Sequence, residues 1–184
     1  MSKGRLVLVV GPSGVGKDSI INAAKAELAS QVDYVFPRRI ITRQSDPNSE
    51  DHDTVGADEF ERLCAQGAFF LHWPAHGLRY ALPGTIATQL SEGATVIANV
   101  SRSVISEARA KHSDTLVIRI TASPEVLEQR LLNRGREDLA AVRRRLTRSA
   151  ELPPGGTVRT IVNDGSLEEA VQQFLEDLGT RGNR

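Results

Sequence analysis

The fold is decided by residues 5–18, which read Arg5-Leu-Val-Leu-Val-Val-Gly-Pro-Ser-Gly-Val-Gly-Lys-Asp18. The first six of these residues are almost wholly apolar, which predicts a strand buried on both faces, as at the centre of a parallel sheet. A glycine-rich turn follows, and apolar residues at helical spacing then predict a helix from Asp18 to Ser30. A strand, a glycine-rich turn and a helix in succession indicate an α/β fold.

The glycine-rich turn has the composition of a phosphate-binding loop. Residues 11–17 match the Walker A pattern G-x-x-x-x-G-K directly after a strand and before a helix. In this motif the glycines let backbone N–H groups turn inward around phosphate oxygens, and the lysine reaches the β- and γ-phosphates. The residues expected to hold the phosphates of ATP are Gly11, Pro12, Ser13, Gly14, Val15, Gly16, Lys17 and Asp18.

The position after the lysine departs from the motif. Asp18 stands where Ser or Thr normally binds Mg²⁺, and the strand that usually delivers an acidic metal ligand ends in the neutral residue Asn99. Mg²⁺ accepts one or two carboxylates together with phosphates and waters. We therefore interpret Asp18 as the metal ligand, supplying the charge that the strand end lacks.

The strand-then-helix order recurs along the chain. Further strands are expected at 94–99, 115–121 and 157–162, and each is followed by helix-forming sequence. The pattern predicts one domain over residues 1–184, a doubly wound parallel sheet of the P-loop NTPase class. Two segments break the order, the polar stretch 44–56 and the stretch 130–148 with its seven arginines. Insertions of this kind on a rigid sheet are where substrate loops and lids usually lie.

Composition excludes several classes of protein. The 184 residues include 23 Lys plus Arg and 23 Asp plus Glu, which argues against a nucleic-acid partner held by bulk charge. There is no apolar run of the roughly 18–20 residues that a membrane helix needs, and no secretion signal, so a cytoplasmic protein is expected. The single cysteine, Cys64, excludes a disulfide framework and is expected to be a small core residue.

The arginines favour a small kinase among the P-loop proteins. The chain has no Asn-Lys-x-Asp sequence, which a GTPase would use to read guanine. Phosphoryl transfer develops charge on the moving group, and guanidinium groups that close over it stabilise that charge. The residues expected in this role are Arg134, Arg136 and Arg145, with Arg130 at the nucleotide. The expected substrate is a phosphorylated metabolite.

Seven short motifs in order carry a resemblance to a known family. They include Ile41-Thr-Arg43, His76-Gly-Leu-Arg-Tyr80, Arg134-Gly-Arg-Glu137 and Asn163-Asp-Gly-Ser-Leu167. Over nearly its whole length the chain resembles the guanylate kinase family. Within that family it is most similar to the ribose 1,5-bisphosphate phosphokinases of phosphonate catabolism. The resemblance implies an acceptor-binding segment at about 36–83, a lid at about 130–148, and transfer of phosphate from Mg²⁺-ATP to ribose 1,5-bisphosphate, which makes phosphoribosyl pyrophosphate.

The departures from guanylate kinase concern the acceptor. The glutamate that reads guanine aligns with His72, the serine after Tyr80 is missing, and Asp46 replaces an arginine that holds the GMP phosphate. The resemblance also places Asn163 where the family contacts adenine. The residues expected to bind the sugar bisphosphate are Arg39, Arg43, Glu50, His52, Arg79, Tyr80 and Arg102.

Two alternatives remain at this point. One is a nucleoside monophosphate kinase of the guanylate type, against which the lost guanine contacts speak. The other is a non-catalytic guanylate-kinase-like binding module. Such modules usually lose the lysine or the glycines of the phosphate loop, and Gly11, Gly14, Gly16 and Lys17 are all present here.

Overall fold

A computed structural model describes residues 4–43, 52–133 and 151–179 of the chain. It contains two sheets, one of five strands and one of four. The chain divides into two compact units. Met1–Leu8 and Gln31–Leu116 form one unit, and Val9–Ser30 and Val117–Arg184 form the other.

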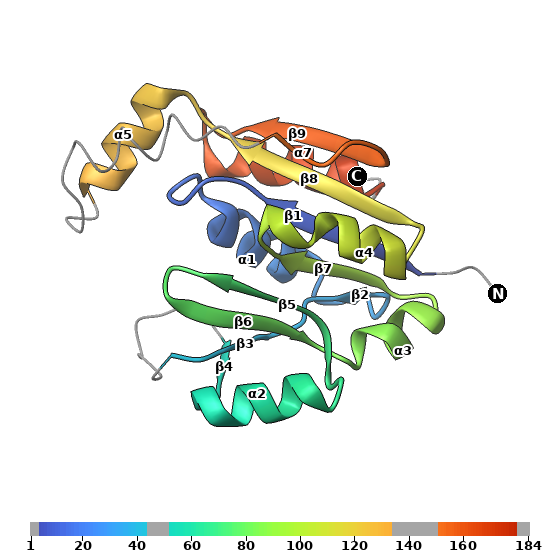
Figure 1. Cartoon of the computed structure of the whole chain (residues 1–184). Coiled ribbons are helices and arrows are strands. Elements are labelled where there is room, and N and C mark those ends of the chain that lie inside the picture. Colours follow the sequence, from blue (N-terminus) through green and yellow to red (C-terminus); the bar gives the residue numbers. More distant parts are fainter. Residues whose placement is uncertain (1–3, 44–51, 134–150, 180–184) are drawn as a thin grey trace. The chain divides into compact units, whose positions relative to one another are not determined.

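The larger sheet is the parallel sheet that the sequence predicts. Its strand order is β2 (Tyr34–Val35), β7 (Thr95–Asn99), β1 (Arg5–Val10), β8 (Thr115–Thr121) and β9 (Thr157–Val162) (Figure 1). In β1, the middle strand, the side chains of residues 6–10 have no exposed surface. This burial explains why the strand is apolar at every position from 6 to 10 rather than at alternate ones.

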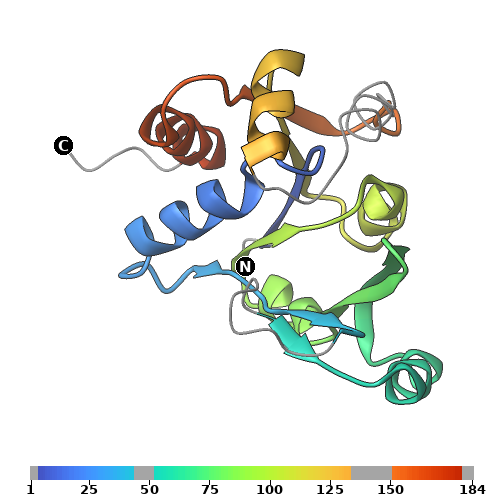
Figure 2. The same ribbon diagram turned by 90° about the vertical axis from the view of Figure 1, so that its left-hand side faces the viewer.

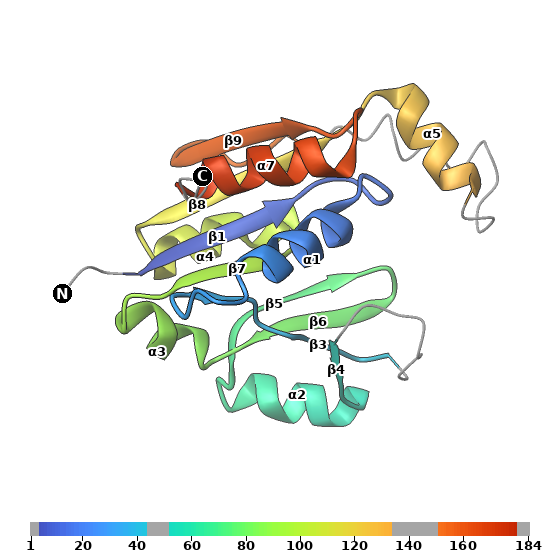
Figure 3. The ribbon, with the colours of Figure 1, turned by 180° about the vertical axis from the view of Figure 1, so that it is seen from behind.

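The unit made of Val9–Ser30 and Val117–Arg184 contains three described helices. They are α1 (Lys17–Glu27), α5 (Pro124–Asn133) and α7 (Leu167–Leu178), and α1 packs beside α7 (Figure 3). The start of α7 is the capping box that the sequence predicts, because Ser166 Oγ accepts from the Glu169 N–H and Glu169 Oε2 accepts from the Ser166 N–H. The helix expected over 18–30 ends earlier, at Glu27.

The smaller sheet belongs to the other unit. Its order is β4 (His52–Thr54), β3 (Arg39–Ile41), β6 (Leu78–Pro83) and β5 (Phe69–Ala75). The helix α2 (Ala57–Ala65) lies beside it (Figures 1 and 2). Phe60 of α2, Phe69 of β5 and Ala81 of β6 form a small core between them. Cys64 packs against this core, which confirms the prediction made for it.

The same unit contains three further short elements. They are α3 (Ile86–Ser91), the 3₁₀ turn η1 (Arg102–Val104) and α4 (Ile105–Lys111). The helix expected after Asn99 thus begins as a 3₁₀ turn, with Ser101 Oγ accepting from the Ser103 N–H at 3.3 Å. Among the helices that the structure describes, none is long and apolar enough to cross a membrane.

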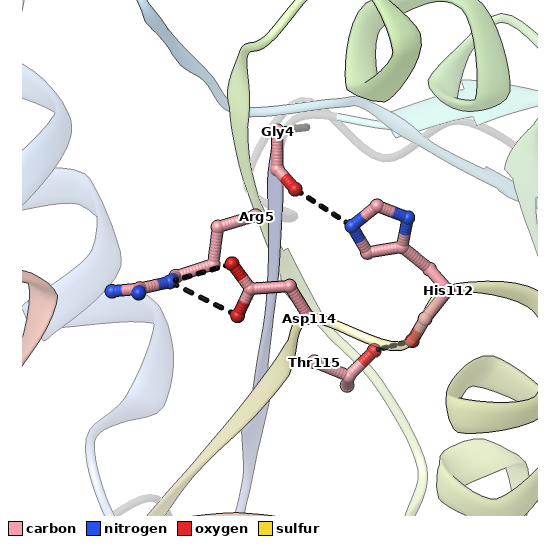
Figure 4. Close-up of polar contacts among 5 residues, drawn as sticks. All are labelled: Gly4, Arg5, His112, Asp114 and Thr115. Carbon is pink, nitrogen blue, oxygen red and sulfur yellow. Dashed lines mark hydrogen bonds and ion pairs between the residues drawn. The ribbon is translucent and has the colours of Figure 1, made fainter. Parts of the chain in front are cut away.

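Polar contacts join the start of β1 to the residues around the start of β8 (Figure 4). Arg5 Nε lies 3.3 Å from Asp114 Oδ1, and a ring nitrogen of His112 lies 2.7 Å from the Gly4 carbonyl oxygen. Thr115 Oγ1 donates to the His112 carbonyl at 2.6 Å. These contacts fix the beginnings of both strands, while the glycine-rich turn follows the end of β1.

Candidate active site

The residues predicted to bind substrate fall into two groups, one in each unit. The first group surrounds the glycine-rich turn between β1 and α1. Gly14 and Gly16 have φ values of 85° and 93°, which glycine adopts at little cost and other residues rarely adopt. A Cβ atom on Gly11 would clash with the Ile120 carbonyl oxygen of β8. The turn therefore needs glycine at these positions for its shape.

Lys17 lies over the beginning of this turn. Its Nζ donates to the carbonyl oxygens of Gly11 at 2.8 Å and Pro12 at 2.9 Å. Lys17 is also the first residue of α1, so its charge adds to the partial positive charge of the helix N-terminus. The turn, the lysine and the helix start together form a site suited to phosphate.

Two side chains converge on the carbonyl oxygen of Val15 in the turn. Asn163 Nδ2 donates to it at 2.8 Å, and Arg130 Nη1 donates to it at 3.4 Å. The Asn163 side chain is buried, and its backbone N–H donates to the Thr121 carbonyl at 2.8 Å. The predicted nucleotide-binding residues Arg130 and Asn163 thus both contact the phosphate loop itself.

The second group lies on one face of the smaller sheet. The rings of Trp73 and Tyr80, which are paired in β5 and β6, stack with centroids 5.8 Å apart and planes 8° apart. The Arg39 guanidinium carbon lies 5.5 Å from the centre of the Tyr80 ring. The structure therefore brings together two predicted acceptor residues, Arg39 and Tyr80. Trp73 supports Arg39 and Tyr80 by stacking on the Tyr80 ring.

The opposite face of this sheet holds Arg79. Adjacent residues of a strand point to opposite faces, so Arg79 and Tyr80 are separated. Arg79 forms an ion pair with Glu61 of α2, and its guanidinium lies 5.4 Å from the Phe60 ring centre. The structure does not place Arg79 with the Arg39 and Tyr80 group, and its contact with substrate stays a prediction.

The same alternation places His72 on the face of β5 opposite the Tyr80 side. His72 pairs with Ala81, and its Nε2 lies 3.4 Å from Cys64 Sγ of α2. It is therefore on the face away from Tyr80. The β5 residues on the Tyr80 face are Leu71 and Trp73, and the alignment of His72 with the guanine-reading glutamate stays a prediction.

The other predicted acceptor residues lie in or near these strands. His52 is half-buried on β4 and is in register with Arg39, whereas Arg43 is exposed just beyond β3. Arg102 is half-buried at the start of η1, which packs against β5. Glu50, Arg134, Arg136 and Arg145 lie outside the residues that the structure describes.

A comparison with protein families agrees with this arrangement. The model of the family described as guanylate kinase matches residues 3–179. The chain belongs to the guanylate kinase family.

Curated relatives within this family are similar over almost their full length. The ribose 1,5-bisphosphate phosphokinase PhnN of Brucella melitensis is 46% identical over 177 residues, which are 96% of this chain and 92% of the relative. The protein of the same name from Bradyrhizobium diazoefficiens is 44% identical, over 94% of this chain and 86% of its own length. Among solved structures, guanylate kinase from Anaplasma phagocytophilum has a TM-score of 0.74 at 18% identity, covering 100% of this chain and 88% of that one. This last likeness concerns the fold.

Two features of this guanylate kinase family member did not follow from its sequence. One is the stacking of Trp73 on Tyr80, which alternation along a predicted hairpin could have indicated. The other is the bond from the Ser123 N–H to Asp164 Oδ1 at 2.7 Å, which ties the start of α5 to the end of β9. No sequence signal marks this second contact, because its partners are far apart along the chain.

We expect Gly16→Ala to weaken ATP binding. A Cβ atom at this position would lie 2.6 Å from Asn163 Nδ2, so the amide that holds the loop would have to move. The substitution also places a side chain at positive φ, which costs about 1–2 kcal/mol. Calorimetric titration with ATP and thermal unfolding would measure both effects.

Gly67→Ala is the matched control for this variant. Gly67 also has a positive φ, of 67°, but nothing lies within 4 Å of its Cβ position. It should lose similar stability and keep its ATP affinity. Equal losses of affinity in the two variants would contradict a specific role for the Gly16 and Asn163 contact.

Proposed function

We propose that the chain is a ribose 1,5-bisphosphate phosphokinase. In the proposed reaction an oxygen of the substrate's 1-phosphate forms a bond to the γ-phosphorus of ATP, and the bond from that phosphorus to the β–γ bridging oxygen breaks. The products are 5-phosphoribosyl 1-diphosphate and ADP. The observation that carries the proposal is an intact phosphate loop, with Lys17 over its start, in a chain 46% identical to a phosphokinase of that name.

The donor half of the reaction rests on the phosphate loop. Lys17 and the loop N–H groups hold the β- and γ-phosphates, and Arg130 lies beside the loop at Val15. Arg134, Arg136 and Arg145 follow α5 in the sequence, and we assign them to the transferred group. Their guanidinium groups would stabilise the charge that develops there.

Mg²⁺ fits this site with Asp18 as its protein ligand. Asp18 is exposed in the first turn of α1, next to Lys17 in the sequence. Within residues 4–43, 52–133 and 151–179 there is no group of three or more His, Cys, Asp or Glu side chains that could hold a metal. This fits an ion bound mainly by phosphates and one carboxylate. When bound, the ion would neutralise charge on the β- and γ-phosphates.

The acceptor half rests on the smaller sheet. Ribose 1,5-bisphosphate carries two phosphates and no base, so cations and hydrogen bonds must recognise it. Arg39 is held on Tyr80, and Tyr80 on Trp73, which gives the guanidinium a fixed orientation toward a phosphate. We assign Arg43, Arg102, His52 and Glu50 to the same substrate, whereas Arg79 lies on the opposite face of the sheet and pairs with Glu61.

The Tyr80 face favours the sugar over GMP. Guanine presents N–H donors that require an acceptor, and a guanylate kinase supplies a carboxylate for them. Neither Leu71 nor Trp73, the β5 residues on this face, carries a carboxylate. A guanine N–H that is left without such an acceptor would cost about 1–3 kcal/mol.

We expect ADP release from Mg²⁺-ATP with ribose 1,5-bisphosphate and not with GMP or AMP. A coupled assay would measure ADP, and mass spectrometry would identify the sugar product. Turnover with GMP would contradict the specificity argument from Leu71 and Trp73 and leave the kinase activity intact. No turnover with any acceptor would favour a binding module.

Arg39→Lys should raise the KM for the sugar bisphosphate about ten-fold, because an ammonium keeps the charge but loses the planar stack and the bidentate geometry. The KM for ATP should stay unchanged. Arg38→Lys is the matched control, since Arg38 is exposed and pairs with Asp53 at 3.1 Å. Initial-rate measurements that show the same change in both variants would contradict a specific role for Arg39.

Asp18→Ser should weaken Mg²⁺ use although it restores the usual Walker A residue. The half-saturating Mg²⁺ concentration should rise at least about ten-fold, a loss seen even for residues that only support metal ligands. Ser19→Ala, one residue further along α1, is the control and should leave the Mg²⁺ titration unchanged. An unaltered titration of Asp18→Ser would rule out Asp18 as the ligand.

A further inference from the structure

We infer that Asn163 is a positioning residue that acts on the donor phosphates through the backbone of the phosphate loop. It holds the peptide bond between Val15 and Gly16 in the orientation that phosphate binding needs. This inference rests on the proposed function for its physiological ligand, ATP. It differs from the adenine contact that the family resemblance implies for this position.

The geometry of the peptide bond carries the first step. Asn163 Nδ2 donates to the Val15 carbonyl oxygen at 2.8 Å, close to the ideal length of an N–H···O bond. A trans peptide is planar, so its C=O and the following N–H point in opposite directions. The structure has no cis peptide bonds among its described residues. Fixing the Val15 oxygen toward Asn163 therefore turns the Gly16 N–H away from Asn163, where it can donate to a phosphate oxygen.

The surroundings of Asn163 carry the second step. Only 5% of its surface is exposed, and its backbone N–H donates to the Thr121 carbonyl at 2.8 Å. The next residue, Asp164, accepts from the Ser123 N–H at 2.7 Å. The first of these bonds is made to the end of β8 and the second to the start of α5. The Asn163 amide is therefore held by a strand and a helix rather than by the loop.

The close approach of Gly16 carries the third step. The αL backbone and the missing side chain of Gly16 allow the Asn163 amide to reach the loop, since a Cβ would lie 2.6 Å from Nδ2. Arg130 contributes a second, longer bond of 3.4 Å to the same Val15 oxygen. Two donors from separate elements thus fix one peptide. A burial of this degree leaves the Asn163 side chain little surface with which to contact a base.

The test compares ligands that contain the phosphates with a ligand that contains only the nucleoside. Asn163→Leu keeps the approximate volume and removes the donor. Isothermal titration with Mg²⁺-ATP, Mg²⁺-tripolyphosphate and adenosine would measure each affinity. We expect about a ten-fold loss for both ATP and tripolyphosphate, the usual effect of one buried hydrogen bond, and no change for adenosine.

Thr115→Val is the matched control. Like Asn163→Leu, it removes a side-chain donor from a buried residue. The hydrogen bond that is lost runs from Thr115 Oγ1 to the His112 carbonyl at 2.6 Å, at the opposite end of β8 from Thr121 (Figure 4). Its affinities for all three ligands should be unchanged. An equal loss in both variants would assign the effect to general destabilisation and overturn the inference.

The other outcomes also decide the question. A loss for ATP and adenosine with tripolyphosphate unchanged would restore the adenine contact and overturn the inference, as would unchanged affinities throughout. If Asn163→Leu does not fold, Asn163→Ser removes the same amide in a smaller polar residue and carries the same expectations. Tripolyphosphate binding is measured without an acceptor, so failure of ribose 1,5-bisphosphate as substrate would overturn the proposed function alone.

Discussion

A loop that binds phosphate through its own N–H groups has to be held by its carbonyl oxygens from the other side. In this chain that constraint falls on Val15, whose oxygen accepts from Asn163 and Arg130. Gly11 approaches the Ile120 carbonyl so closely that a side chain would not fit, and Gly16 approaches Asn163. β1 is buried on both faces because it is the middle strand of the larger sheet, and its end brings the turn next to β8.

The smaller sheet uses the two faces of its strands for different purposes. One face packs against α2 through Phe60, Phe69 and Ala81, with Arg79 paired to Glu61 at its edge. The other face stacks Arg39, Tyr80 and Trp73. Because a strand alternates at every residue, a shift of one position exchanges structural residues for binding residues. That rule separates Tyr80 from Arg79 and places His72 with Cys64 rather than with the predicted acceptor residues Arg39 and Tyr80.

The sequence predicted the features that depend on local patterns. The strand at Arg5–Val10, the glycine turn, the strand over 115–121 and the capping box at Ser166 are all confirmed, because each is encoded within a few neighbouring residues. It did not predict β2 and β4, whose two and three residues carry no periodicity. The contact of Asn163 with Val15 joins positions 148 residues apart, and only the folded sheet brings them together. Alignment by position also did not indicate which face of β5 His72 occupies.

The proposed preference for a sugar bisphosphate over GMP depends on which hydrogen-bonding and charged groups the Tyr80 face of the smaller sheet carries and which it lacks. A site that must bind a base needs hydrogen-bond partners matched to that base, and a buried partner left unpaired is costly. Leu71 and Trp73 are buried on the Tyr80 side and carry no carboxylate that could replace the hydrogen bonds that guanine makes to water. A sugar bisphosphate makes no such demand, since its recognition depends on charge that Arg39 can supply from a fixed stack. Discrimination against a nucleotide can therefore arise when one hydrogen-bond acceptor is removed from a strand, while the phosphate loop and the Asn163 amide that supports it remain as they are in a kinase.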